Sequence, residues 1–207
     1  MGHITKIVQL KLTMRTLVFA TNNDNKVKEI RAVLGNEFQI LPLKEAGILI
    51  DIPEPHDTLH ENAREKSTTI YTLTGKDCFA EDTGLEVDAL GGEPGVRSAR
   101  YAGNAANFDA NVAKLLKNLT GELNRAAKFR TVISLIINSK EYQFEGICKG
   151  SITNQILGSG GFGYDPIFSP EGSDKTFAEL SLEEKNIFSH RRKAVDKLIA
   201  FLNSYHG

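Results

Sequence analysis

The chain has no apolar run long enough to cross a membrane. A membrane-spanning helix needs about 20 consecutive apolar residues, whereas the longest run here, residues 132–137, is only as long as a strand. The N-terminus also lacks a long apolar segment followed by small residues, so we do not expect a secretory signal peptide. The first clear strand pattern follows Met14. We therefore expect residues 1–13 to be an extension or leader and residues 14–207 to form a single domain.

Cysteine is scarce, and neither sign of charge is in excess. Cys78 and Cys148 lie in apolar, strand-like sequence without metal-ligand spacing, so we expect buried thiols in a reducing, cytoplasmic compartment. The 25 Lys and Arg nearly balance the 26 Asp and Glu, which gives a formal net charge of -1. This balance argues against a broad surface for DNA or RNA. A chain of 207 residues with 41% hydrophobic residues can bury one substantial core.

Strand-like and helical patterns alternate along the chain, as in an α/β fold. Residues 138–141 separate the last two strand patterns in the manner of a hairpin turn. We expect strands at residues 16–21, 38–43, 77–80, 129–137 and 142–152, and helices that begin near residues 27, 58, 107, 181 and 189.

A polar turn rich in asparagine lies between the first expected strand and the first expected helix. Free backbone N–H groups and the positive end of a helix attract phosphate at such a place, and Lys26 adds a positive charge. The glycines of a Walker loop are absent. Asn and Asp also favour turns and helix caps, so the turn alone fits either role. Its residues are Thr21, Asn22, Asn23, Asp24, Asn25 and Lys26.

Two adjacent acids, Glu81 and Asp82, follow a short apolar strand. Neighbouring side chains on a strand point to opposite faces, so we expect the strand to end there in a polar cleft, where a cation would account for both acids. A solvated turn is the alternative, because the glycines and proline of residues 91–95 are turn signals. A third acid, Glu61, lies three residues after Thr58 and is also explained as part of a helix capping box.

Residues 158–168 combine four glycines with three aromatic rings and an acid. Glycine lets the backbone approach a ligand closely, Phe162 and Tyr164 offer flat faces for a base, and Asp165 offers an acceptor. The alternative is a loop whose aromatic rings fold back onto the core. His190 and Arg191 stand in the first turn of the last helix, where cations oppose the helix dipole, and this conflict indicates a functional role.

Together these motifs suit a nucleotide: carboxylates for Mg²⁺, a cationic turn for phosphates, and a planar pocket for a base. Their order resembles the inosine triphosphate pyrophosphatase family, also described as non-canonical purine NTP pyrophosphatases. Two departures stand out, since Glu81 replaces the Asp of many relatives and Ser159 precedes the glycine pair. The matching segments are residues 21–26, 61–63, 81–85, 89–95, 160–168 and 185–191.

The resemblance implies a fold and a reaction. The fold would be an elongated, two-lobed mixed sheet flanked by helices, with the active-site cleft between the lobes, and the protein would be a homodimer. The reaction would be Mg²⁺-dependent hydrolysis of ITP, dITP and XTP to the monophosphate and pyrophosphate, which removes these nucleotides from the nucleotide pool.

The resemblance also implies roles for individual residues. Asp82 would activate a water molecule for attack on the α-phosphorus, and Lys26 would offset charge on the departing pyrophosphate. Mg²⁺ would be held by Asp82 with Glu81 and Glu61. The remaining substrate-binding residues would be Thr21, Asn22, Asn23, Asp24, Asn25 and Thr83 near the phosphates, Phe162, Gly163, Tyr164, Asp165 and Lys185 around the nucleoside, and His190 and Arg191 at the purine 6-oxo group.

Three other functions are compatible with these motifs. A non-hydrolytic nucleotide-binding protein could use the same scaffold, although a complete set of carboxylates costs stability unless a metal is held. A nucleic-acid-binding module could use Phe162, Tyr164 and the basic residues 190–193, but the near-neutral charge argues against it. A pyrophosphatase for pyrimidine nucleotides would differ only in its choice of base.

Overall fold

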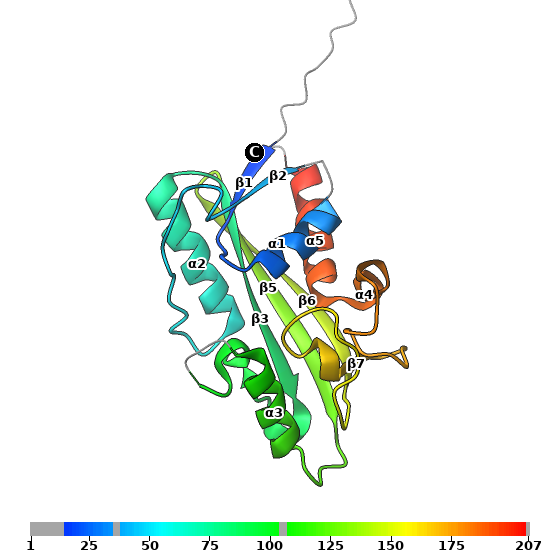
Figure 1. The fold of residues 1–207 in the computed structure, drawn as a ribbon. Helices are drawn as coiled ribbons and strands as arrows, with labels where there is room; N and C mark the ends of the chain where they lie inside the picture. Colours follow the sequence, from blue (N-terminus) through cyan, green and yellow to red (C-terminus); the bar gives the residue numbers. More distant parts are fainter. Residues whose placement is uncertain (1–14, 35–37, 104–106, 206–207) are drawn as a thin grey trace, which may run out of the picture.

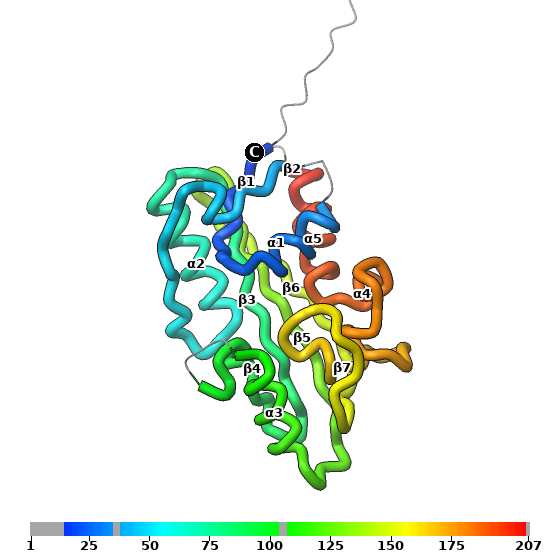
Figure 2. The backbone as a smooth tube through the Cα atoms, in the orientation of Figure 1, coloured from blue at the N-terminus to red at the C-terminus, as the bar shows by residue number. Residues whose placement is uncertain are grey.

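The computed structural model describes residues 15–34, 38–103 and 107–205. The expected extension at residues 1–13 lies outside these described residues. The described chain forms an elongated α/β molecule in which three long strands run along most of its length (Figure 1). Residues near both ends of the chain lie together at one end of the molecule, where the Arg15 guanidinium lies 5.7 Å from the centre of the Tyr205 ring (Figure 2).

Among the described residues, one mixed sheet of seven strands organises the fold, in the order β2-β1-β3-β5-β6-β7, with β4 paired to β3. Strands β2, β1 and the start of β3 are parallel, whereas β3, β5, β6 and β7 are antiparallel. The strands are β1 (Arg15–Phe19), β2 (Phe38–Pro42), β3 (Cys78–Val87), β4 (Pro94–Gly95), β5 (Ala126–Ile137), β6 (Lys140–Ile152) and β7 (Phe168–Pro170).

Helices flank this sheet, which confirms the predicted fold class. Helices α1 and α5 lie together, and α2 lies apart from them across the long strands (Figure 1). Three short 3-10 helices lie in the loops. The helices are α1 (Asp24–Leu34), α2 (Leu59–Thr74), η1 (Asp88–Leu90), η2 (Ser98–Arg100), α3 (Phe108–Asn118), η3 (Asp165–Ile167), α4 (Leu182–Phe188) and α5 (His190–Ser204). Among the described residues, no helix combines the length and the apolar character that a membrane span requires.

Alternating side chains of β1 and β3 build two cores, one on each face of the sheet. Leu17 and Phe19 of β1 pack with Phe79 of β3 and the inner faces of α1 and α5. Val18, between them in the sequence, packs on the other face with Ala80 and with Ile70 of α2. A third core, which we call the lower core, lies between α3, β5 and the β7 region, in the lower half of the molecule as Figure 1 shows it. The period-2 pattern that predicted the strands therefore also decides which helix each strand residue meets.

Two local predictions need correction, and both corrections concern the site. Strand β3 does not end at the acidic pair, because backbone pairing with β5 continues through Glu81 opposite Ile133 and Asp82 opposite Val132. Helix α1 begins at Asp24, so the second half of the predicted turn is helical. The hairpin is confirmed, with Asn138 and Ser139 both at positive φ between β5 and β6.

Candidate active site

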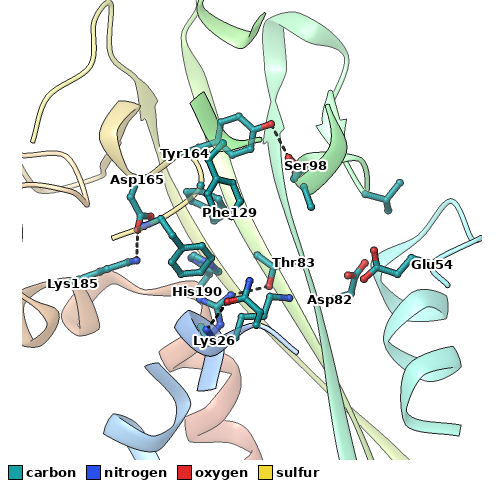
Figure 3. Close-up of a pocket in the computed structure, with 17 residues that line it drawn as sticks. Lys26, Glu54, Asp82, Thr83, Ser98, Phe129, Tyr164, Asp165, Lys185 and His190 are labelled. Atoms are coloured by element: carbon teal, nitrogen blue, oxygen red, sulfur yellow. Dashed lines mark hydrogen bonds and ion pairs between the residues drawn. The ribbon is translucent and has the colours of Figure 1, made fainter. Parts of the chain in front are cut away.

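A cavity of about 110 Å³ is lined by residues that lie far apart in the sequence (Figure 3). We call it the central cavity. The start of α1, the middle of β3, the segment around η2, the β6–β7 loop and the α4–α5 junction all contribute to its walls. Its lining residues are Asn23, Lys26, Glu54, Asp82, Thr83, Val96, Ser98, Ala99, Phe108, Phe129, Phe162, Gly163, Tyr164, Asp165, Lys185, His190 and Arg191.

Most of the residues predicted from the sequence reach this cavity, although they come from distant parts of the chain. Those that line it are Asn23, Lys26, Asp82, Thr83, Phe162, Gly163, Tyr164, Asp165, Lys185, His190 and Arg191. The predicted residues that do not line it are Thr21, Asn22, Asp24, Asn25, Glu61 and Glu81. The lining residues that were not predicted from the sequence are Glu54, Val96, Ser98, Ala99, Phe108 and Phe129.

The side chains of Glu81 and Asp82, the two adjacent acids of β3, lie on opposite faces of the sheet. Glu81 is buried, and its carboxylate accepts hydrogen bonds from Arg191 Nε at 2.8 Å and Nη2 at 3.0 Å, with Lys26 Nζ 3.1 Å away. Burial alone would raise its pKa, but the charges of Arg191 and Lys26 hold the pKa of Glu81 at about 2. Glu81 is therefore an ionised partner of two cations. The structure does not join it to Asp82 as a metal-binding pair, because β3 turns the two side chains apart.

Asp82 instead lies beside Glu54 (Figure 3), and the two carboxylates share the ammonium group of Lys66. Lys66 Nζ is 2.9 Å from Asp82 Oδ1 and 2.7 Å from Glu54 Oε1. Burial raises the pKa of Asp82 and the Glu54 carboxylate adds to this rise, while Lys66 opposes it. Asp82 Oδ2 is buried and has no hydrogen-bond partner among the described residues. A buried carboxylate oxygen without a partner is costly, so this atom points to a ligand.

The carboxylates of Asp82 and Glu54 fit a hard cation. Mg²⁺ is usually bound through one or two carboxylates together with waters and substrate phosphates, so a pair is sufficient. Within residues 15–34, 38–103 and 107–205, no group of three or more Asp, Glu, His or Cys side chains is arranged to hold a metal ion. Glu54 was missed because it stands between two prolines in a loop that resembles an ordinary connection in sequence.

Glu61 lies outside the central cavity and bonds to the N-cap residue of α2, although its carboxylate meets the Thr58 hydroxyl and not the backbone N–H that a capping box would use. Its backbone N–H donates to Thr58 Oγ1 at 3.1 Å, and its exposed carboxylate accepts from the same hydroxyl at 2.8 Å. Thr58 thereby caps α2. The structure does not bring Glu61 to Asp82.

The asparagine-rich segment organises the start of α1. Asn23 Oδ1 accepts from the backbone N–H groups of Asn25 at 3.0 Å and Lys26 at 3.2 Å, and Thr21 Oγ1 accepts from the Asn23 N–H at 3.2 Å. Asn22 donates its side-chain amide to the carbonyl of Ile50. These bonds hold the positive end of α1 and the Lys26 side chain at the cavity, which suits an anion.

The β6–β7 loop is held in place by Asp165. Its Oδ2 accepts from the Phe162 N–H at 2.8 Å and from Lys185 Nζ at 2.7 Å. Gly161 has a φ of 71°, and a Cβ there would lie only 2.0 Å from Asp165 Oδ2, so glycine is required. Tyr164 folds back onto the core and donates its hydroxyl to the carbonyl of Ser98. For this ring, the alternative of packing against the core therefore applies. Phe162 remains only partly buried.

A chain of alternating charges connects this loop to the start of α1. Lys185 Nζ also lies 2.8 Å from Glu29, and Glu29 pairs with Arg191, which binds Glu81. The sequence analysis missed Glu29, although it lies three residues after Lys26 and therefore on the same side of α1. Because every member is partnered, this buried network holds Lys185, Arg191 and Lys26 in fixed positions.

His190 offers a neutral imidazole to the cavity. It is only 3% exposed and stacks on Phe129, with ring centroids 4.6 Å apart and an interplanar angle of 14°. Burial, together with the nearby charges of Arg191 and Lys185, holds its pKa well below the usual range. Nδ1 is buried and has no hydrogen-bond partner among the described residues. A neutral imidazole has one donor and one acceptor nitrogen, so it can read the polar edge of a planar ligand.

The sequence and the fold are similar to those of known proteins. The model of the Ham1 family matches residues 17–201. A dITP/XTP pyrophosphatase from Flavobacterium johnsoniae is 54% identical over 188 residues, covering 91% of this chain and 98% of that protein. One from Porphyromonas gingivalis is 51% identical over 190 residues, with 91% and 98% covered. The solved Ham1 protein of Staphylococcus aureus superimposes with a TM-score of 0.83 at 39% identity, over 91% of this chain and 98% of that one.

Proposed function

The chain belongs to the Ham1 family, and on that premise we propose that it hydrolyses ITP, dITP and XTP to the monophosphate and pyrophosphate. The observation that carries this proposal is that Asp82 Oδ2 has no hydrogen-bond partner among the described residues. Asp82 lies beside Glu54 in a cavity that is also lined by cationic and aromatic side chains. The relatives named dITP/XTP pyrophosphatase support it. A protein that only binds nucleotides would not need a buried carboxylate oxygen left free to accept a proton.

We propose that the carboxylates of Asp82 and Glu54 hold Mg²⁺. When bound, Mg²⁺ would supply positive charge to the phosphate oxygens and lower the pKa of a coordinated water. Lys66 fixes Asp82 through Oδ1, which leaves Oδ2 to accept the proton of the water that attacks the α-phosphorus. Lys26, at the start of α1, offsets the charge of the departing pyrophosphate.

We also propose that His190 and Arg191 read the purine 6-oxo group. Arg191 has five N–H donors, and four of them are taken by Glu81, Glu29 and Thr83. The remaining N–H and one imidazole nitrogen of His190 are available to the base. An oxo group accepts hydrogen bonds, whereas the amino group of adenine donates them, so adenine would leave buried donors unpaired at about 1–3 kcal/mol each.

The products of ITP hydrolysis test this reaction. With Mg²⁺ we expect IMP and pyrophosphate in equal amounts, separated by ion-exchange chromatography, because the attack falls on the α-phosphorus. The same mixture with the metal chelated serves as the control and should contain unreacted ITP. Formation of IDP and inorganic phosphate would show attack at the γ-phosphorus and would overturn the proposed reaction. The homodimer and the cytoplasmic location stay predictions.

A further inference from the structure

Phe108 does not complete the lower core, although its spacing along α3 predicts that it should. Val112, Leu115 and Leu119 follow it at helical intervals and are almost completely buried. Phe108 itself is 36% exposed and lines the central cavity. As the first residue of α3, it lies beyond the end of the lower core, at the side of the cavity formed by the lower half of the molecule.

The ring of Phe108 meets the ring of Phe162 across the cavity. Their centroids are 6.2 Å apart and the rings are inclined at 56°. Phe162 comes from the β6–β7 loop, and its ring also lies near Lys185 Nζ at 5.4 Å and Arg191 Cζ at 5.6 Å. Two aromatic side chains from separate elements therefore flank the part of the cavity nearest to Lys185 and Arg191, and Arg191 is one of the two residues proposed to read the base.

We propose that Phe108 is a second base-contacting residue, which closes on the purine from the side opposite Phe162. This inference rests on the proposed function, because it assigns a further contact to the same substrate. A planar base stacked between two rings needs about 7 Å between them, or roughly 3.5 Å for each face. The present separation of 6.2 Å is slightly smaller. A modest rotation of the exposed Phe108 ring would admit the base.

The surroundings of Phe108 suit this role. Val96 and Ala99 add apolar surface to the lining and, like Phe108, belong to the segment between β4 and β5, whereas the charged lining residues all come from other segments. Closing the ring on a base would remove apolar surface of both partners from water, which is favourable. Phe108 therefore contributes to nucleoside affinity, whereas Lys26 and the carboxylates act on the phosphates.

Binding of two fragments of the substrate tests the proposal without requiring turnover. Isothermal titration calorimetry with IMP should show roughly tenfold weaker binding for Phe108→Ala, because base stacking on an aromatic side chain is lost. This tenfold loss corresponds to ~1.4 kcal/mol of binding free energy. Binding of pyrophosphate with Mg²⁺ should stay within about twofold, because no phosphate contact changes. Phe108→Tyr should restore IMP binding because it keeps the ring.

Leu123→Ala is the matched control, since Leu123 is 98% exposed and does not line the cavity. It should leave both affinities unchanged. The proposal would be overturned by unchanged IMP binding in Phe108→Ala, by equal loss of IMP and pyrophosphate binding, or by absence of IMP binding to the unmodified protein. If the unmodified protein binds IMP but releases no pyrophosphate from ITP, the proposed reaction fails, and the IMP affinities still decide the role of Phe108.

Discussion

Asp82→Asn is expected to lower the rate of pyrophosphate release by about 10²–10⁴-fold, because the amide cannot accept a proton from water. The shape of the side chain is kept, and its Oδ1 can still accept from Lys66, which lies 2.9 Å away. Nucleotide affinity should therefore change by only a few-fold. Steady-state kinetics with ITP gives the rate, and calorimetry with IMP gives the affinity.

Glu61→Gln is the matched control for this variant. Glu61 was predicted from the sequence as a companion of Asp82, but it lies outside the central cavity and bonds to Thr58. Its neutralisation should leave turnover within about twofold of the unmodified protein, as expected for a surface position. Near-normal turnover in Asp82→Asn would refute the assignment of the base. A large loss in Glu61→Gln would restore the sequence-based prediction for that residue.

Arg191→Met is expected to lower the free energy of unfolding by about 3–5 kcal/mol, the usual cost of removing one partner from a buried ion pair. Arg191 pairs with both Glu81 and Glu29, and all three side chains are buried. In the unmodified protein the ionised Glu81 stabilises the fold above its ordinary pKa near 4.5, and this contribution is lost as the pH falls towards its folded pKa of about 2. In Arg191→Met, the burial of Glu81 would oppose ionisation of its carboxyl group at neutral pH.

The neighbouring Arg192 provides the control for this measurement. Its side chain is 41% exposed and pairs with Asp196 one turn along α5 at 2.7 Å. Arg192→Met should cost no more than about 0.5 kcal/mol, as is typical of an exposed pair at this spacing. Urea unfolding at neutral pH compares the two variants. Equal stabilities would contradict the view that the charge network holds the site together.

Much of the site could be predicted because its residues belong to short local motifs. Asp82 follows a strand pattern, Lys26 ends an asparagine-rich turn, and Arg191 stands in the first turn of a predicted helix. Each of these patterns can be recognised from a few neighbouring residues. The fold could be predicted for a similar reason, since the alternation of apolar residues in β1 and β3 decides which face of the sheet each side chain meets.

The missed residues reach the site through packing between distant segments. Lys66 belongs to α2 and resembles any surface lysine in sequence, yet the helix turns it inward to the two carboxylates. Glu54 arrives from a proline-flanked loop. Phe108 has the spacing of a core residue but projects past the end of the lower core. The strand through Glu81 continues because of pairing with β5, which depends on residues about 50 positions away.

Pyrophosphate release from ITP, XTP, GTP, ATP and dTTP, measured side by side with Mg²⁺, tests the central claim most directly. We expect kcat/KM for ITP and XTP to exceed that for ATP by roughly 100-fold or more, since two buried donors at about 1–3 kcal/mol each would be left unpaired by adenine. Guanine carries the same 6-oxo group as hypoxanthine, so ATP rather than GTP is the comparison that tests the reading of the base by His190 and Arg191. Equal release from all five would contradict the proposed reading of the base by His190 and Arg191, and no release from any would contradict the proposed reaction itself.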